Sequence, residues 1–382
     1  MTKVNAPLEI CELEPVRPLE FGQVLVKVLV SGICGSQLLE IAGLKPGPQP
    51  PLPHPMGHEG CGIVLEIGPG VKQVKVGDKV VMHWRKGAGI ESDFPRYQFK
   101  DKEEGRVKRE ETATELHAPA GIAGGREMAP PEVVEPRIIT GGRVTTFMEQ
   151  AVCSENRLTT VPQDTPEELC ALLGCGLSTA LATLENEARL LRGESILIVG
   201  CGGLGTNLIL AAKLTGACPI TVTDVEPEKS RMALSIGADD FWHFDAARMI
   251  ADQAAGRQPS SLPHRFDVII ETSGAPAALH ATIGMLAPSG RFIMVGQPKP
   301  GARVTLENAC HLFEGSGKTI KATQGGGYRP DLDCPRYARF FAQHGALPEA
   351  MVSDRFSLDD INKALDCVRN GGASRVIIYP GK

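Results

Sequence analysis

Three short stretches of the chain carry residues whose types could perform chemistry. SGICGSQLLE places Cys34 between glycines and follows it with Ser36, and GHEG places His58 and Glu59 ahead of an apolar run. A third stretch, GCG, contains Cys175. Each signal alone is weak, because an isolated cysteine is among the most buried residue types and a single histidine is more often a satisfied polar side chain. Cys34 alone is therefore a candidate nucleophile, metal ligand or buried side chain.

A glycine-rich turn in the second half of the chain is the strongest single motif. In SILIVGCGGLGTNLILAAKLTG the pattern GxGxxG is formed by Gly200, Gly202 and Gly205, directly after an apolar strand and before a helix. The first glycine permits a tight turn, the second lets the backbone approach a pyrophosphate, and the third lets helix and strand pack closely. The motif predicts a dinucleotide site with the phosphates at the start of the helix.

The residue that ends the next strand bears on which dinucleotide binds. Asp224 stands where a carboxylate would accept hydrogen bonds from an adenosine ribose. A carboxylate repels a ribose 2′-phosphate, and no arginine follows directly in DVEPEK, so NAD is favoured over NADP. The alternative is that Asp224 is only a turn residue before Pro227.

Beside a nucleotide fold, the two cysteines and the histidine predict a metal site. Thiolate and imidazole are ligands that zinc prefers, and three protein ligands leave a fourth position for water or substrate. We therefore expect Cys34, His58 and Cys175 to bind one catalytic zinc.

Composition limits the classes of protein that can present these residues. At 382 residues, with 42% hydrophobic and 22% charged residues, the chain is typical of a two-domain globular enzyme. A net charge of -5 argues against nucleic acid as the main partner. The start lacks the basic end and apolar stretch of a signal peptide, and no apolar run could span a bilayer. Eleven scattered cysteines fit reduced thiols in the cytoplasm.

The pattern of elements changes along the chain. The first hundred residues are typical of short strands separated by Gly and Pro, but residues 85–143 become charged and Gly/Pro-rich, which predicts a mobile lobe or insertion. Past residue 162, one stretch with helical spacing precedes alternating strands and helices, which predict a parallel sheet. After residue 320 the elements are mixed, with one amphipathic helix in SLDDINKALDCVRNG and a final strand in RVIIYP.

The motifs in this order resemble one family. GICGS, GHEGCGIVLEIGPGV, KVGDKV, GCGLSTA, VGCGGLG, ETSG, VGQP and RVIIY together resemble the zinc-dependent medium-chain dehydrogenase/reductases, the alcohol and polyol dehydrogenases. The ligand set Cys, His, Cys is that of alcohol dehydrogenase. The resemblance implies an α/β protein with a GroES-like β-barrel catalytic domain over residues 1–175 and 322–382. A Rossmann doubly wound parallel sheet would occupy residues 176–321, with the site between the two domains.

The resemblance also implies an activity and roles for residues. Zinc would lower the pKa of a bound hydroxyl, and a hydride would pass between NAD(H) and a secondary alcohol or polyol, with Ser36 as the first proton carrier. Glu59 would lie beside the metal as an outer partner or exchanging ligand. The residues expected at the cofactor are Thr179 and Leu204 near the nicotinamide, Val295 near the carboxamide, Arg375 at the pyrophosphate, and Gly200, Gly202, Gly203, Gly205 and Asp224. A homodimer or homotetramer is implied as well.

The chain departs from the family near the metal ligands. Gln37 stands where many relatives carry an acid or a histidine, and we expect its amide to contact His58. Leu39 stands where some relatives have a relay histidine, so the proton must leave by another route, for which His54 and His83 are candidates.

A second departure concerns a structural metal. Many relatives hold a second zinc on four closely spaced cysteines, but no cysteine lies between Cys61 and Cys153 in this chain. We therefore expect one catalytic zinc and no structural zinc of that kind.

The stretch MHWRKGAG raises the question of the substrate. Trp84, Arg85 and Lys86 could form a rim for a substrate that carries phosphate or carboxylate, such as a sugar phosphate, or they could be a solvated basic turn. Two other functions stay open from sequence: a zinc-free quinone or enone reductase on the same fold, and a non-catalytic dinucleotide-binding protein.

Overall fold

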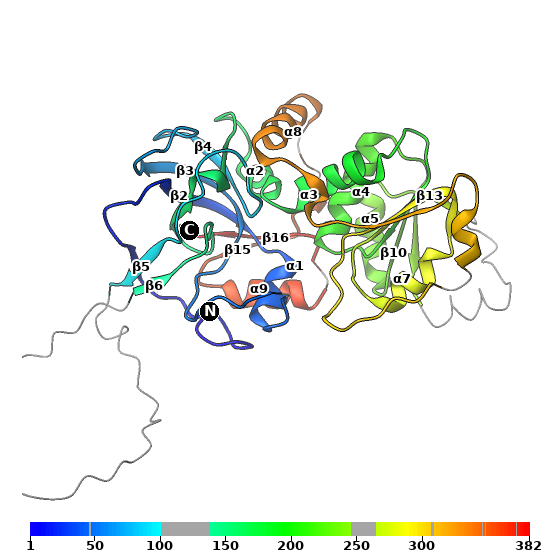
Figure 1. The fold of residues 1–382 in the computed structure, drawn as a ribbon, viewed down its shortest axis with the longest axis horizontal. Coiled ribbons are helices and arrows are strands. Elements are labelled where there is room, and N and C mark those ends of the chain that lie inside the picture. The colour runs from blue at the N-terminus through cyan, green and yellow to red at the C-terminus, as the bar shows by residue number, and fades with distance from the viewer. Residues whose placement is uncertain are drawn as a thin grey trace, which may run out of the picture.

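The computed structural model describes residues 1–45, 47–100, 138–245, 265–306, 309–345, 347, 349–371 and 373–382. Figure 1 shows two lobes, and both ends of the chain lie in the lobe that contains β2, β3 and β4. Most of the predicted mobile lobe, residues 101–137, lies outside the described residues. Its described flanks form two strands of a three-stranded sheet, whose members are β1 (Leu13–Pro15), β5 (Arg96–Phe99) and β6 (Ile138–Thr140).

The main sheet of the first lobe is built from both ends of the chain. Its seven strands follow the order β15-β16-β2-β3-β4-β8, with β7 also paired to β2. All pairs are antiparallel except β15 with β16, and Ile378 of β16 lies opposite Ser31 of β2. The strands are β2 (Gln23–Gly32), β3 (Glu59–Ile67), β4 (Lys79–His83), β7 (Gln150–Ser154), β8 (Leu158–Thr160), β15 (Asp354–Ser357) and β16 (Val376–Tyr379).

The second lobe contains a six-stranded sheet that is parallel throughout. Its order is β11-β10-β9-β12-β13-β14, so the direction of travel through the sheet reverses between β9 and β12. This is the strand order of a Rossmann fold, and the predicted doubly wound sheet is confirmed. The strands are β9 (Ile196–Val199), β10 (Ile220–Asp224), β11 (Asp240–His243), β12 (Phe266–Glu271), β13 (Leu286–Met294) and β14 (Thr319–Ala322).

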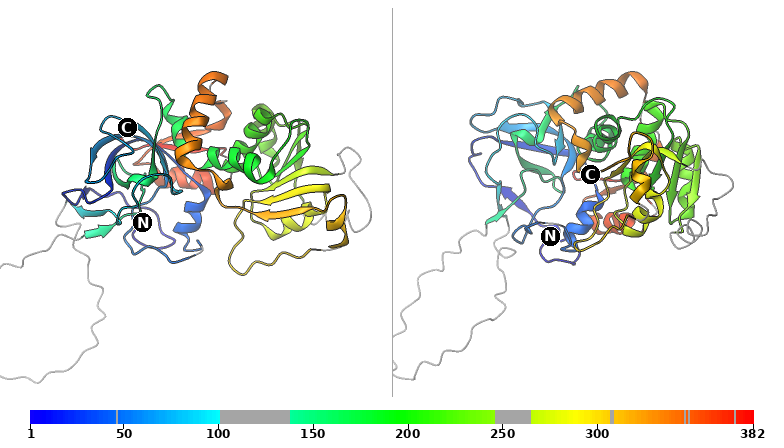
Figure 2. Two further views of the ribbon diagram at one scale, coloured as in Figure 1. Left: turned by 45° about the horizontal axis from the view of Figure 1, so that its top comes forward. Right: turned by 45° about the vertical axis from the view of Figure 1, so that its right-hand side comes forward.

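Helices surround the second sheet and fill the junction between the lobes. Figure 2 shows α8 over that junction and α4 against the parallel sheet. The α-helices are α1 (Gly35–Ile41), α2 (Glu167–Leu173), α3 (Gly176–Ala182), α4 (Gly203–Thr215), α5 (Ser230–Ile236), α7 (Pro276–Ile283), α8 (Pro330–His344) and α9 (Ile361–Arg369). Shorter helices are η1 (Glu155–Arg157), the π-helix η2 (Thr183–Ala188), η3 (Pro227–Lys229), η4 (Ala309–Phe313), η5 (Gly325–Gly327) and η6 (Glu349–Met351).

Helices α2 and α3 connect the cores of the two sheets. Leu172 and Leu177 are fully buried in one hydrophobic cluster that also contains Val81 of the first sheet and Ile198 of the second. The sequence predicts a single helical stretch here, but the helix breaks between Leu173 and Gly176. The two residues of the break, Gly174 and Cys175, are therefore next to a dense apolar core on both sides.

No single helix among the described residues is long and apolar enough to cross a membrane. Glu167–Leu173 and Gly176–Ala188 reach that length and composition only together, and they are bent by 58° at the break between them.

Candidate metal and cofactor site

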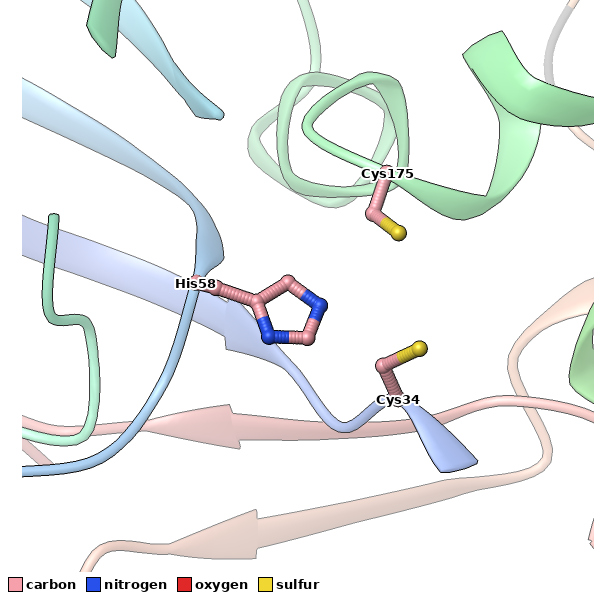
Figure 3. Close-up of side chains that lie close together, drawn as sticks. All are labelled: Cys34, His58 and Cys175. Carbon is pink, nitrogen blue, oxygen red and sulfur yellow. The ribbon is translucent and has the colours of Figure 1, made fainter. Parts of the chain in front are cut away.

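Cys34, His58 and Cys175 come together from three separate segments. Their ligand atoms, two Sγ atoms and one imidazole nitrogen, all lie within 4.8 Å of one another. Figure 3 shows the two thiols and the ring pointing toward a shared space. Among the described residues this is the one cluster of at least three potential metal-binding side chains. Two thiols and one imidazole at this separation fit a zinc ion with an open fourth position.

The surroundings of the cluster stabilise the ionised form of one of the three side chains, Cys34. The hydrogen bond from Cys175 and the neighbouring His58 hold the pKa of Cys34 well below its ordinary value, although burial opposes this shift. The hydroxyl of Ser36 also donates to Cys34 Sγ, across 3.3 Å. A thiolate is the form of cysteine that binds metals. The site therefore already favours the ionised form of one ligand.

Local backbone features aim each ligand at the site. Cys34 precedes α1 in extended conformation, and its backbone N–H donates to Oε1 of Gln37 across 2.8 Å. His58 follows Gly57, whose φ is 97° and where a Cβ atom would lie 2.3 Å from Oγ1 of Thr146. Only glycine fits that position. Cys175 occupies the break before α3, with φ -151° and ψ -76°.

Glu59 is bound by Arg375 and not by the metal ligands. Its side chain is fully buried, and Oε1 accepts a hydrogen bond from Nη2 of Arg375 across 2.7 Å. Burial raises the pKa of Glu59, and the guanidinium of Arg375 opposes that effect. Both carboxylate oxygens contact Arg375, and a role for Glu59 as an outer partner or an exchanging ligand of the metal stays a prediction.

Arg375 joins the metal ligands to the glycine turn. A Cβ atom on Gly176, next to Cys175, would lie 2.7 Å from Nη2 of Arg375, and one on Gly203 would lie 3.2 Å from Nη1. The side chain was expected to bind the cofactor pyrophosphate, but it is 4% exposed and bonded to Glu59. Because Arg375 lies beside Gly203 of the glycine motif, we still predict that it contacts the cofactor.

Two expectations for the surroundings of the metal are corrected here: the contact of Gln37 with His58, and the candidacy of His83 as a proton relay. Gln37 is buried, but its amide oxygen accepts from the Cys34 backbone and its Nε2 has no partner, so it does not orient His58 as expected. His83 is buried with its ring nitrogens near the Arg85 carbonyl, at 2.7 Å, and Thr159 Oγ1, at 2.9 Å.

The two candidate relay histidines are poorly suited to carry a proton. Burial lowers the pKa of His83 to about 3, which keeps the ring neutral at physiological pH, and both ring nitrogens are already engaged by Arg85 and Thr159. Burial also lowers the pKa of His54, whose Nδ1 is buried without a partner.

The glycine turn has the steric properties expected of its motif. Gly200 has φ 98°, and a Cβ atom on it would lie 2.5 Å from Oγ1 of Thr272. A Cβ atom on Gly205 would lie 1.9 Å from the carbonyl oxygen of Gly200. At Gly202 a Cβ atom would meet nothing within 4 Å, so the backbone there is open to a ligand.

Asp224 ends β10 beside this turn, and its carboxylate forms an ion pair with Lys229. Its Oδ2 accepts from the backbone N–H of Cys201 across 2.6 Å, and both oxygens lie 3.1 Å from Nζ of Lys229. Both side chains are almost fully buried. Sequence reasoning missed Lys229, which is visible in DVEPEK. Because the ammonium offsets the carboxylate, the repulsion of a 2′-phosphate is weaker than Asp224 alone predicts.

Three further residues expected at the cofactor lie around the same region. Thr179 is buried in α3, while Leu204 and Val295 are half-buried against the central core. The backbone N–H of Val295 donates to the carbonyl of Glu271 across 2.8 Å. Their contacts with a nicotinamide stay predictions.

The basic stretch after β4 splits into two environments. The guanidinium of Arg85 lies 5.9 Å from the ring centre of Trp84 and 5.8 Å from that of Tyr328, and it donates to the Gln324 carbonyl across 3.0 Å. Lys86 instead pairs with a neighbouring acid, Glu91, at 2.7 Å. The predicted rim of two adjacent cations therefore reduces to Arg85, with the indole nitrogen of Trp84 buried and without a partner.

Comparisons with known proteins agree with this geometry. Residues 20–163 match the family described as alcohol dehydrogenase GroES-like domain, and residues 203–342 match zinc-binding dehydrogenase. The chain is 26% identical over 379 residues to alcohol dehydrogenase 6 from Peromyscus maniculatus, covering 99% of this chain and 96% of that protein. It is 27% identical over 380 residues to an S-(hydroxymethyl)glutathione dehydrogenase from Escherichia coli O6:H1, with coverage of 97% and 96%.

Solved structures show the same fold. A crystal structure of an alcohol dehydrogenase zinc-binding domain protein from Burkholderia ambifaria superimposes with a TM-score of 0.74. It shares 26% sequence identity, and the match covers 98% of this chain and 96% of that one. The first lobe is therefore the GroES-like domain that the resemblance implies.

Proposed function

Because the chain belongs to the zinc-dependent medium-chain dehydrogenase/reductase superfamily of alcohol dehydrogenases, we propose that it oxidises a secondary alcohol or polyol with NAD, or reduces the matching carbonyl with NADH. The observation that carries this proposal is the cluster of Cys34, His58 and Cys175. Arg375 lies beside the residues that flank this cluster and beside the glycine turn, which supports the proposal of a metal site next to a dinucleotide site.

The chain's own residues would divide the work at this site. Cys34, His58 and Cys175 would hold the zinc, which when bound supplies Lewis-acid assistance to a hydroxyl or carbonyl oxygen. Ser36, already bonded to Cys34 Sγ, would accept the hydroxyl proton. The glycine turn would hold the cofactor, and oxidation would yield a carbonyl, NADH and one proton.

The substrate we propose carries an anionic group. Arg85 is half-buried and forms no ion pair among the described residues, although its charge is one of the influences that lower the pKa of Glu187. Tyr328, under this guanidinium, donates through its hydroxyl to the carbonyl of Gly174 across 3.1 Å, one residue before Cys175. A phosphate or carboxylate could accept charged hydrogen bonds from the guanidinium of Arg85.

The function is tested by following NAD reduction with a panel of alcohols, polyols and polyol phosphates, together with zinc content. We expect about one zinc per chain, and loss of zinc and turnover in Cys34→Ala with retention of NADH binding. The matched control is Cys153→Ala, because Cys153 is a buried free cysteine outside the cluster of Cys34, His58 and Cys175. Turnover of a quinone or enone in zinc-free protein, or cofactor binding without any turnover, would contradict the proposal. Assembly as a homodimer or homotetramer stays a prediction.

A further inference from the structure

Glu271 is a buried acid at the end of β12 that no step above uses. Its side chain is fully buried, and Oε1 accepts from the backbone N–H groups of Ser273, at 2.7 Å, and Gly274, at 3.0 Å. The hydroxyl of Ser273 donates to the same oxygen, and Oε2 lies 3.1 Å from the nitrogen of Gly274. Burial raises the pKa of Glu271, and the hydrogen bonds from Ser273 and Gly274 oppose that effect. These contacts fix the turn of residues 272–274.

On one side this turn supports the first glycine of the nucleotide motif. The hydroxyl of Thr272 donates to the carbonyl of Val199 across 2.9 Å, at the end of β9. A Cβ atom on Gly200 would lie 2.5 Å from this hydroxyl oxygen, Oγ1 of Thr272. The turn and the glycine motif are therefore in direct contact.

On its other side the turn meets the end of β13. The carbonyl of Glu271 accepts from the backbone N–H groups of Val295, at 2.8 Å, and Gly296, at 3.0 Å. A Cβ atom on Gly296 would lie 2.3 Å from the nitrogen of Gly274. Because β12 lies between β9 and β13 in the sheet, residues 272–274 are wedged between the two loops that follow those strands.

Ligands of doubly wound sheets bind at the carboxyl ends of the strands, beside the point where the strand order reverses. Here that point lies between β9 and β12. We propose that Glu271 is a positioning residue for the dinucleotide: its carboxylate fixes residues 272–274, and through them the backbone of Gly200 and of Val295–Gly296. The inference rests on the proposed function for the identity of the ligand as a dinucleotide. It predicts an effect on cofactor affinity and none on zinc.

The chemistry of a carboxylate suits this task. An ionised carboxyl only accepts hydrogen bonds, so it can bind several convergent N–H and O–H groups at once. Alanine would leave the donors of Ser273 and Gly274 buried without an acceptor. Glutamine has the same shape and keeps one acceptor oxygen for them. The conservative variant should therefore restore most of what alanine loses.

The test is a fluorescence titration of NADH, and in parallel NADPH, with the full-length protein and its variants. Glu271→Ala should raise the Kd for NADH about tenfold or more, with the zinc content unchanged. Glu271→Gln should stay within about threefold of wild type. The matched control is Glu155→Ala, which removes a buried carboxylate of the first lobe that likewise accepts from three donors, the backbone N–H groups of Lys72, Gln73 and Ile90. It should lower the unfolding midpoint without changing the Kd.

A wild-type Kd in Glu271→Ala would overturn the inference, and so would an equal loss of affinity in Glu155→Ala. If Glu271→Ala does not fold, Glu271→Asp, which retracts the carboxylate by one methylene, should still weaken NADH binding, and an unchanged Kd there would overturn the inference as well. Wild-type protein that binds neither NADH nor NADPH would refute the proposed function and the inference with it. Wild-type binding with unaltered variants would refute only the inference.

Discussion

Nη2 of Arg375 donates to Oε1 of Glu59 across 2.7 Å in a fully buried ion pair, which ties the start of β16 to the residue that follows His58. Removing one partner of a buried pair leaves an uncompensated charge in the protein interior. This ion pair therefore holds Glu59, the neighbour of the metal ligand His58, against a residue more than 300 positions later in the chain.

Arg375→Met should destabilise the protein by about 3–5 kcal/mol, because the carboxylate of Glu59 would stay buried and unpaired. Urea unfolding measures this loss. Adding Glu59→Gln to the same variant should recover part of the loss. The exposed pair of Arg355 and Glu168, at 2.7 Å, provides the control, and Arg355→Met should cost at most about 1 kcal/mol. Equal costs for the two arginines would contradict this role.

We expect the pair of Asp224 and Lys229 to set the cofactor preference, so that substitutions of the two residues shift it in opposite directions. Wild-type protein should use NAD about tenfold better than NADP, judged by kcat/KM. Lys229→Met should widen that ratio, since it removes the ammonium that offsets Asp224. Asp224→Ser should narrow it. A shift toward NADP in Lys229→Met would show that Asp224 does not control the preference.

Arg85→Ala should raise the KM for a polyol phosphate about tenfold or more, because a charged hydrogen bond to the substrate is lost. The KM for the neutral polyol should stay as in wild type. Lys86→Ala is the matched control, since its ammonium is exposed and already paired with Glu91. If both substrates respond equally, or the neutral polyol is the better substrate of wild type, the anionic substrate is wrong.

His83 should make the protein sensitive to acid. Its ordinary pKa is 6.5 and burial lowers the pKa to about 3, so between these values the unfolded chain binds a proton that the native chain does not. Stability is then fully present above pH 6.5 and falls with decreasing pH by about 1.4 kcal/mol per unit.

His83→Gln should flatten this dependence, measured as urea unfolding at several pH values from 5 to 7. The exposed His243 provides the comparison, and His243→Gln should leave the slope unchanged. Identical slopes for wild type and His83→Gln would rule out the buried neutral ring as the cause.

Sequence reasoning worked best where the requirement is local. The glycine motif depends on contacts among residues close in sequence, such as Gly200 with Gly205, and the alternation of strands with helices fixes a parallel sheet. The metal ligands followed from residue types, order and the family resemblance.

Sequence reasoning failed where the partner of a residue is distant in sequence, or where the apolar pattern continues across a break. The break that aims Cys175 is flanked by Gly174 and Gly176, but the apolar pattern continues through Leu173 and Leu177 on its two sides and favours one continuous helix. Nothing near Arg375 in the sequence indicates Glu59 as its partner. Gln37 was assigned to His58 by analogy, whereas its amide oxygen binds the adjacent backbone of Cys34.

The return of β15 and β16 to the first sheet has a consequence for synthesis on the ribosome. All strands of the parallel sheet lie between residues 196 and 322, so that sheet can close while the last sixty or so residues are still inside or near the exit tunnel. Strands β2, β3, β4, β7 and β8 can pair before then, but the first sheet is complete only when β16 reaches β2, and Glu59 gains its contact with Arg375 at the same time. The first sheet is thus begun before the parallel sheet and completed after it.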